Sequence, residues 1–405
     1  MDDVLLTGLG VLSCLGSGTD AFWEGLNKAH SVPIRVPDPD ARMPYPLMYM
    51  VPEADLPTGP EEQDGLPLGR GSQFAIEAAR QAVADAGLVL PGAGGTAVDP
   101  RRVAVSIGTG MGDSGLHEEW RTGGSPSGDR WAPTFPVASV VGGWFGAQGA
   151  NTSVSNACAA SGFGLSVAAD LIRAGEADVV IAGGSEAYSR VALACFNRLG
   201  AIDPERCRPF DAHRKGTLFG EGAAVMVLES AEHARRRGAT KAYAKLAGAG
   251  WSCDAHHATA PEAEGEQIER AMRHAMREAG ARPGPSGDVG FVVAHGTGTE
   301  LNDTVESRVL GSVLAEDTAG TPVYALKAML GHTGGAAGAL SALTAALILH
   351  HRSVPPNVPL DAQDPECAVH LPTDAPTPLS GAYGLVNAYA FGGNNVTLVL
   401  QEAAV

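Results

Sequence analysis

The sequence predicts an α/β protein built as two similar halves, each with a buried mixed sheet covered by helices. Hydrophobic residues make up 44% of the 405 residues, which supplies enough apolar surface for a large core. β-rich segments alternate with alanine-rich segments along the chain. The same series of segments then occurs a second time in the same order, which indicates an internal duplication.

Each half opens with a strand followed by a helix. Residues 3–13, DVLLTGLGVLS, are typical of a strand that enters a turn of small residues, and residues 242–253, AYAKLAGAGWSC, show the same pattern. Residues 72–87 and 266–280 are amphipathic and end in glycine, as helices often do. The first two elements of the halves therefore match.

Three further pairs of segments match in order: 103–110 with 290–298, 160–172 with 336–348, and 222–230 with 394–402. The middle pair, a turn followed by a helix, aligns at an offset of 176 residues. We therefore predict two domains, residues 1–240 and residues 241–405, related by a pseudo-twofold axis. The first half also contains two segments without periodicity, 32–68 and 113–135, which we expect to form a substrate entrance or a partner surface.

The charge and the chain start disfavour several classes of protein. Lys and Arg number 28 against 45 Asp and Glu, and the resulting net charge of −17 disfavours binding to nucleic acid or an anionic membrane. The start MDDVLLTGLG lacks the basic and apolar regions of a signal peptide, and no apolar run of about 18 residues occurs. We therefore expect a cytoplasmic protein without a membrane span.

The cysteines and histidines do not form a metal-binding pattern. The six cysteines are scattered without a CxxC pair, which indicates reduced thiols rather than disulfides or a zinc site. His256-His257 and His350-His351 have no carboxylate or cysteine at ligand spacing. We therefore expect no metal site.

Cys158 is the strongest candidate nucleophile. It lies in SVSNACAASGFG, where an apolar run reaches a sharp turn and a helix follows. A thiol at a helix N-terminus experiences the positive end of the helix dipole and exposed amides, which we expect to lower its pKa. Ala157, Ala159 and Ala160 leave room for a substrate to approach. An inert buried thiol is the alternative interpretation.

Two histidines lie on glycine-rich turns in the second half. His295 follows a β-run in VVAHGTGTE, and His332 precedes a helix start in LKAMLGHTGGAAG. The offset of 176 pairs Asn156 with His332 and Cys158 with Gly334. A pseudo-twofold axis would bring these two helix N-termini face to face, so the thiol and the imidazoles are expected to share one site.

Two further features could support such a site. Lys327 follows an apolar run in YALKAMLGH, and a buried lysine needs a partner, for which Glu306 is the candidate. A surface lysine is the alternative. The segment NAYAFGGNN (387–395) has adjacent glycines that let backbone amides approach a ligand, so an amide there and the Cys158 amide could form an oxyanion hole.

Five segments, taken together, resemble the elongating β-ketoacyl-acyl carrier protein synthases, the group that includes type II fatty acid and polyketide ketosynthases: SNACAASG, AHGTGTELND, LKAMLGHTGGAAG, AFGGNN and RPFDAHRKGTLFGEGAAVMVLE (208–229). The resemblance covers nearly the whole chain. It implies a thiolase-like fold with duplicated βαβαβαββ halves in a five-layered α-β-α-β-α arrangement. It also implies a homodimer, or a heterodimer with a ketosynthase-like partner.

The resemblance further implies a decarboxylative Claisen condensation. Cys158 would accept an acyl group from a phosphopantetheine thioester. His295 and His332 would bind the thioester carbonyl of a malonyl-type extender and promote its loss of CO₂, with two neutral N–H donors stabilising the enolate. The resulting carbanion would attack the acyl group on Cys158. The substrates are carried on acyl carrier protein, so no cofactor is expected.

Supporting roles follow by motif from the same resemblance. Phe391 would gate the acyl pocket, and its amide would form the oxyanion hole with the amide of Cys158. Lys327, with Glu306 as its partner, would hold the electrostatics around His295. Substrate contacts are expected from four residues matched by family position: Thr297 and Thr299 at the pantetheine arm, and Met111 and Phe196 at the acyl pocket.

Docking of the carrier protein requires a basic patch, because that partner is normally acidic and this chain is acidic as well. The richest cluster lies in RCRPFDAHRK (206–215) and contains Arg206, Arg208, Arg214 and Lys215. Structural ion pairs are the alternative role of these side chains.

Three positions depart from the family pattern. Thr217 stands where the family commonly has a Phe beside the active site, Ala390 replaces the first Gly of the closing loop, and Asn394 replaces a hydroxyl-bearing residue. They favour a type II polyketide or specialised fatty acid pathway. Two alternatives stay open, namely an acyltransferase or unusual-extender enzyme on the same fold, and a weakly active subunit of a ketosynthase heterodimer.

Overall fold

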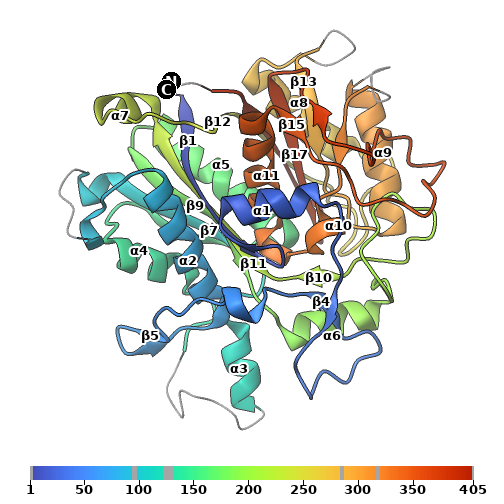
Figure 1. Cartoon of the computed structure of the whole chain (residues 1–405), viewed down its shortest axis with the longest axis horizontal. Coiled ribbons are helices and arrows are strands. Elements are labelled where there is room, and N and C mark those ends of the chain that lie inside the picture. Colours follow the sequence, from blue (N-terminus) through green and yellow to red (C-terminus); the bar gives the residue numbers. More distant parts are fainter. Residues whose placement is uncertain (1–2, 94–97, 122–131, 283–286, 315–319, 404–405) are drawn as a thin grey trace.

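The computed structural model describes residues 3–93, 98–121, 132–282, 287–314 and 320–403. Its main sheet runs through the whole molecule (Figure 1). From edge to edge its strands are β14 (Val323–Tyr324), β13 (Val289–Val293), β17 (Tyr383–Ala390), β18 (Asn394–Gln401), β12 (Ala244–Cys253), β1 (Val4–Ser13), β11 (Gly222–Ser230), β9 (Val179–Glu186), β7 (Val103–Gly108) and β8 (Asn151–Val154), with β2 (Gly16–Ser17) beside β1.

The sheet is symmetric about the contact between β1 and β12. On each side of this contact the next two pairings are antiparallel and the outer two are parallel. β1 and β12 pair only through Leu5 with Lys245 and Leu6 with Ala244. Two equivalent half-sheets therefore meet at a short seam, which confirms the duplication predicted from the sequence.

Helices cover the outer faces of the half-sheets and fill the space between them (Figure 1). They are α1 (Thr19–Asn27), α2 (Arg70–Asp85), α3 (Ser114–Arg121), α4 (Val137–Phe145), α5 (Ala160–Arg173), α6 (Arg190–Leu199), α7 (Ala231–Arg236), α8 (Glu266–Ala279), α9 (Glu300–Leu314), α10 (Lys327–Leu330) and α11 (Ala337–His351).

The central layer consists of α5 and α11, which pack on each other and contact strands of both halves. α11 is buried on all sides from Ala337 to Leu349, as expected for a helix that is apolar all round. α2 and α4 cover the first half-sheet. α8 covers β12 and β18 of the second, and α9 packs on α8 and shares an apolar cluster with β13 and β17. These layers form the predicted five-layered α-β-α-β-α arrangement.

Shorter elements complete the fold. The insertion 32–68 contains four short strands that belong to small sheets. The insertion 113–135 contains α3, and its residues 122–131 lie outside the described residues. The small strands are β3 (Ile34–Arg35), β4 (Leu47–Tyr49), β5 (Glu62–Gln63), β6 (Leu66–Pro67), β10 (Phe219–Gly220), β15 (Ser353–Val354) and β16 (Thr377–Pro378). β4 pairs with β10, and this pairing brings part of the first insertion next to the site described below.

The two central helices begin face to face. A 3-10 turn η4 (Ala157–Ala159) leads into α5, an equivalent turn η6 (Gly334–Ala336) leads into α11, and the two turns contact each other. Aligning the turns pairs Cys158 with Gly335, one residue beyond the predicted Gly334. The predicted meeting of the helix N-termini is confirmed.

The connection between α7 and β12 contains the predicted domain boundary at residues 240 and 241, which stays a prediction.

Among the described residues, none of the helices has the length and apolar character required to cross a membrane.

Glycines allow the outer helices to lie directly on the central strands. A Cβ added to Gly10 of β1 would lie 2.0 Å from the carbonyl oxygen of Ala78 in α2. A Cβ added to Gly250 of β12 would lie 2.0 Å from the carbonyl oxygen of Ala271 in α8. The prediction of a small-residue turn at these positions is wrong, because both glycines lie within strands. Close helix–strand packing explains their presence in both halves.

We expect Gly10→Ala and Gly250→Ala each to destabilise the fold by about 1–3 kcal/mol, because the helix must move off the strand. Gly311→Ala is the matched control, because Gly311 lies in α9 with nothing within 4 Å of an added Cβ. This control should leave stability equal or raise it by up to about 1 kcal/mol through helix propensity. Thermal and urea unfolding measure the effect, and equal stability of all three variants would contradict the packing argument.

Candidate active site

Cys158 lies in the turn η4, four residues after the end of β8, and its side chain is buried. The preceding Ala157 has φ of 46°, a left-handed conformation that is strained for alanine. The contact between η4 and η6 holds this turn in place. Local strain at Ala157 therefore accompanies the placement of the sulfur, as is often found at functional sites.

Two backbone amides, those of Cys158 itself and of Phe391, are directed at the sulfur. Burial nevertheless raises the pKa of the Cys158 thiol to about 11, while Lys327 and the two amides lower it and Glu186 raises it. The expected lowering of this pKa by the helix N-terminus is therefore wrong, because desolvation outweighs the dipole and the amides. The predicted role of these two amides as an oxyanion hole stays a prediction.

His295 follows β13 and is buried against the second histidine. Its ring lies 5.7 Å from the ring of His332 between centroids, at an interplanar angle of 89°. Burial, Lys327 and His332 hold the pKa of His295 well below its usual range, so the imidazole is neutral at physiological pH. The Lys327 Nζ lies 3.4 Å from Nδ1 of His295 and donates to it, which leaves the proton of the neutral ring on Nε2.

His332 lies between α10 and η6. Its backbone N–H donates to the carbonyl of Leu218, and its ring lies 6.0 Å from that of Phe219 at 21°. Burial and Lys327 keep the pKa of His332 well below its usual range, so this ring is also neutral. Its Nδ1 has no hydrogen-bond partner among the described residues. The structure thus provides two neutral imidazoles at right angles.

Lys327 is buried, and desolvation lowers its pKa while the charge of Glu306 raises it. Its Nζ donates to the carbonyl oxygen of His295. No ion pair in the part of the chain that the structure describes joins Lys327 to Glu306. The alternative interpretation of Lys327 as a surface lysine is therefore wrong. The predicted ion pair with Glu306 is also wrong, and the Glu306 charge attracts Lys327 only across a longer distance.

Glu306 instead fixes the backbone of the histidine turn. Its Oε1 accepts the His295 amide and its Oε2 accepts the Gly296 amide, each at 2.8 Å. Asn387 Nδ2 also donates to Oε1 at 3.1 Å. The carboxylate therefore positions His295 through the main chain, which a sequence argument about charge pairs does not reveal.

Two cavities meet at the sulfur. A cavity of about 140 Å³ extends along Met48, Met111, Leu193 and other mainly apolar residues, and a cavity of about 70 Å³ contains both histidines. Cys158 and Phe196 are the residues that line both. The nucleophile candidate therefore lies between an apolar chamber and a chamber that contains both histidines.

Aromatic rings surround the point where the cavities meet. Phe391 is stacked on Phe196 with centroids 5.2 Å apart and an angle of 4°. Phe196 contacts Phe219 edge-on at 4.7 Å, and Phe219 in turn lies against His332. The Phe391–Phe196 pair is thus placed where the predicted gate would stand.

The other predicted substrate residues divide between the cavities. Met111 lines the apolar cavity, whereas Thr297 and Thr299 line the histidine cavity with their hydroxyl oxygens 2.9 Å apart. Asp303 accepts the amides of Thr297 and Gly298, which holds this turn in place. Their placement agrees with the assigned chambers, and their roles stay predictions.

Glu186 is a buried residue that the sequence analysis missed. It ends β9, lines the apolar cavity, and accepts the amides of Gly110 at 2.7 Å, Met111 at 2.9 Å and Gly335 at 2.6 Å. Burial raises its pKa. Its counterpart in function is Glu306, which holds the turn after β13. The available signal was the motif GGSEA, which places a glutamate at the end of a buried strand.

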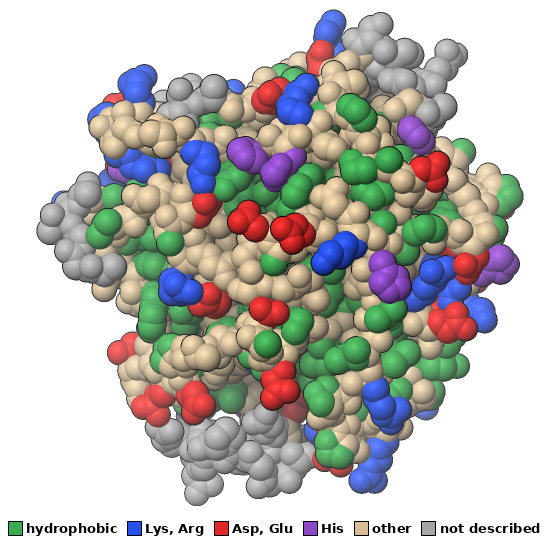
Figure 2. Space-filling model, in the orientation of Figure 1, with side chains coloured by type: hydrophobic (Ala, Val, Ile, Leu, Met, Phe, Trp, Pro, Cys, Tyr) green, Lys and Arg blue, Asp and Glu red, His purple; other side chains and the backbone are tan. Residues whose placement is uncertain are grey.

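The prediction of a basic docking cluster is wrong for two of its four residues. Arg208 is buried and pairs with Asp203, and Arg214 is buried and pairs with Asp364. Only two of the four side chains remain accessible to a partner: Arg206, which is partly exposed and pairs with an aspartate, and Lys215, which is exposed. The face in Figure 2 shows acidic side chains interspersed among the basic ones.

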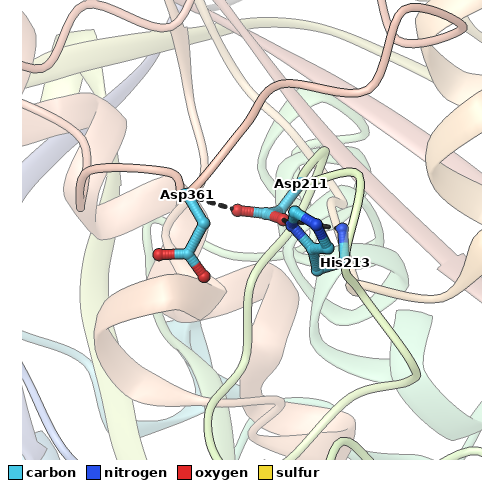
Figure 3. A group of neighbouring side chains, drawn as sticks. All are labelled: Asp211, His213 and Asp361. Carbon is cyan, nitrogen blue, oxygen red and sulfur yellow. Dashed lines mark hydrogen bonds and ion pairs between the residues drawn. The ribbon is translucent and has the colours of Figure 1, made fainter.

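A group of possible metal ligands lies beside this cluster, formed by Asp211, His213 and Asp361 (Figure 3). Asp211 accepts the backbone amides of His213 and Asp361 at 2.7 Å each. Asp361 pairs with Arg206 at 2.9 Å and Arg208 at 3.3 Å. The carboxylates are therefore engaged in holding loops together, and the geometry supplies no reason to assign an ion.

The three departures from the family pattern lie at different distances from the site. Thr217 and Ala390 line the histidine cavity. Asn394 lines neither of the two cavities, although its neighbour Asn395 lines the histidine cavity. The Thr217 hydroxyl lies 3.8 Å from the sulfur of buried Cys207. Thr217 and Ala390 can therefore shape the chamber, and Asn394 has no direct contact with it.

The Cys158 pKa of about 11 gives a prediction about its reactivity. Because the thiolate is the nucleophile, its alkylation by iodoacetamide should accelerate about tenfold per pH unit from pH 7 to pH 9. Peptide-resolved mass spectrometry separates Cys158 from the exposed Cys195 and Cys253. A rate that no longer rises with pH above about pH 8 would instead show that the pKa is low and that the helix N-terminus outweighs burial.

Comparisons with known proteins agree with this site. The family model Beta-ketoacyl synthase, N-terminal domain, matches residues 1–234, and Beta-ketoacyl synthase, C-terminal domain, matches residues 243–361. The chain is 32% identical over 415 residues to 3-oxoacyl-[acyl-carrier-protein] synthase 2 of Staphylococcus aureus (strain COL), with 98% of both chains covered.

Solved structures show the same relationship. A chain of the ishigamide ketosynthase/chain length factor superposes with a TM-score of 0.88 at 34% identity over 100% of both chains. A chain of AntDE:AntF, a type II PKS acyl-carrier protein in complex with its ketosynthase bound to the hexaketide, gives 0.86 at 29% identity, over 99% of this chain and 100% of that one. These likenesses confirm the predicted thiolase-like fold. From the fold, the matched family models and near-complete coverage of its relatives, the chain belongs to the β-ketoacyl synthase family.

Proposed function

We propose that the protein is a β-ketoacyl-acyl carrier protein synthase that condenses a malonyl-type thioester with an acyl chain held on Cys158. The single observation that carries this proposal is the position of the sulfur between two chambers. One chamber is apolar and suits an acyl chain, and the other contains His295 and His332. A shared nucleophile between two substrate chambers is what a two-stage condensation requires.

In the first stage Cys158 takes up the acyl group. The sulfur attacks the thioester carbonyl, a new carbon–sulfur bond forms, and the bond to the pantetheine sulfur breaks. The thiol proton of Cys158 ends on the departing pantetheine thiol. The amides of Cys158 and Phe391 stabilise the negative oxygen of the tetrahedral intermediate.

In the second stage the extender loses CO₂ in the histidine chamber. The bond to the carboxylate carbon breaks, and its electron pair forms an enolate whose oxygen receives hydrogen bonds from His295 and His332. Neutral rings can fill this role, because each neutral imidazole keeps one N–H that can donate to the enolate oxygen. The carbanion then attacks the acyl carbonyl, and Cys158 leaves as a thiolate that takes up a proton.

Positioning residues support both stages. Lys327 donates to Nδ1 of His295 and so keeps the Nε2 proton available for the enolate. Its positive charge also lowers the pKa of the Cys158 thiol against the effect of burial. The stacked pair Phe391 and Phe196 would open to admit the acyl chain to the apolar chamber.

The proposed partner is an acyl carrier protein, whose phosphopantetheine arm would pass Thr297 and Thr299. A solved relative is a ketosynthase in complex with such a carrier, and two others are ketosynthase/chain length factor complexes. We extend these partners to this chain, as a homodimer or with a ketosynthase-like subunit. Arg206 and Lys215 are the remaining candidates for docking. The reaction needs no cofactor, and the proposed compartment is the cytoplasm.

The proposed pathway is type II polyketide or specialised fatty acid synthesis. Support comes from Thr217 and Ala390, which place a hydroxyl and a methyl group in the walls of the histidine chamber, and from the similarity to a type II PKS ketosynthase.

Removal of the sulfur tests the nucleophile. Cys158→Ala should form no acyl adduct in intact-protein mass spectrometry and should lose condensation, by about 10³-fold or more. Cys207→Ala is the matched control, because Cys207 is buried near Lys327 and lines neither cavity. Continued carbon–carbon bond formation by Cys158→Ala would contradict the assignment.

Removal of either imidazole tests whether the histidines act in decarboxylation and not in acylation of Cys158. His295→Ala and His332→Ala should each slow decarboxylation of malonyl carrier protein by about 10²–10³-fold, because one enolate donor is lost. Acylation of Cys158 should persist in both variants. Release of CO₂ without carbon–carbon bond formation in the wild type would instead favour the acyltransferase alternative.

A further inference from the structure

Buried polar atoms without partners are few, and two of them lie in one chamber. Among the described residues, five buried side-chain polar atoms lack a hydrogen-bond partner. Two belong to residues that line the histidine cavity, namely Nδ1 of His332 and the hydroxyl of Tyr389. His332 already has a role in the proposed reaction, whereas Tyr389 has none.

Tyr389 is the residue of β17 that stands two positions before Phe391. Its side chain is 5% exposed, and its ring lies 5.2 Å from that of His295 at an angle of 54°. A phenylalanine would fill the same space without burying a hydroxyl. A buried donor without a partner is costly, so its presence beside a reactive imidazole points to an acceptor that arrives from outside.

The nearby carboxylates do not provide that acceptor. Asp254 is engaged by Asn395 at 2.6 Å, and Glu306 is engaged by the amides of His295 and Gly296. Burial, together with the charges of Glu306 and Asp254, raises the pKa of Tyr389 well above its usual value. The phenol therefore stays protonated at physiological pH and can act only as a neutral donor or acceptor of a hydrogen bond.

We propose that the Tyr389 hydroxyl donates a hydrogen bond to an oxygen of the carrier-bound extender, which makes Tyr389 a specificity-determining residue of the condensation. The inference rests on the proposed function. The acceptor is a carboxylate or carbonyl oxygen and has two sources. One is the carboxylate of the malonyl unit, and the other is an amide carbonyl of the pantetheine arm.

Tyr389→Phe separates these sources because the two stages use different substrates. Loading of Cys158 from acyl carrier protein involves the arm but no malonyl carboxylate. A loss of about 10- to 100-fold in kcat/KM confined to condensation with malonyl carrier protein assigns the bond to the carboxylate. An equal loss in loading and condensation, with an unchanged melting temperature, assigns it to the arm.

Tyr324→Phe is the matched control. Tyr324 of β14 is fully buried, its hydroxyl also lacks a partner, and it lines neither cavity. Both variants should melt at the wild-type temperature or higher, because each removes an unpaired buried hydroxyl. Only Tyr389→Phe should change the kinetics.

Three results would overturn the inference. They are unchanged kinetics of Tyr389→Phe in both stages, equal kinetic losses in Tyr324→Phe, and a loss in Tyr389→Phe that accompanies a lower melting temperature. Failure of the proposed function would be recognised separately, because the wild type itself would then form no acyl adduct on Cys158.

Discussion

The contact between the turns η4 and η6 is the constraint on which the site depends. It sets the N-termini of two buried helices, α5 and α11, against each other at the centre of the molecule. Cys158 lies in the first turn and His332 stands just before the second. Because both helices are enclosed by sheets from both halves, neither terminus can move away without opening the core.

Buried carboxylates then hold the remaining turns against this centre. Glu186 gathers amides from the turn after β7 and from η6, and Glu306 gathers those of the turn after β13. Each carboxylate loses hydrogen bonds to water on burial and accepts hydrogen bonds from several oriented amides instead. These bonds offset part of the free-energy cost of desolvation. The same low-polarity surroundings keep His295 and His332 neutral and raise the pKa of Cys158. Burial therefore favours the neutral imidazoles that the proposed hydrogen bonds need, whereas it disfavours the thiolate form of Cys158.

Local patterns predicted the fold well because they depend on nearby residues. Strand and helix periods, glycine ends and the repeat itself can be recognised in a single sequence, and they predicted two similar halves. The assignment of Arg208 and Arg214 to the docking cluster failed for the opposite reason. Arg214 pairs with Asp364, 150 residues away in the chain, and Arg208 pairs with both nearby Asp203 and distant Asp361, so the burial of these ion pairs depends on the packed molecule.

The sequence by itself determined the duplicated architecture and indicated the three candidate reactive side chains, Cys158, His295 and His332, because residue types and periodicity are local properties. Only the tertiary structure decided the protonation states, the two chambers and the unpartnered hydroxyl of Tyr389. Each of these depends on which groups the fold removes from water and what it places beside them. Desolvation is a property of the packed molecule, so no segment of the chain encodes it alone.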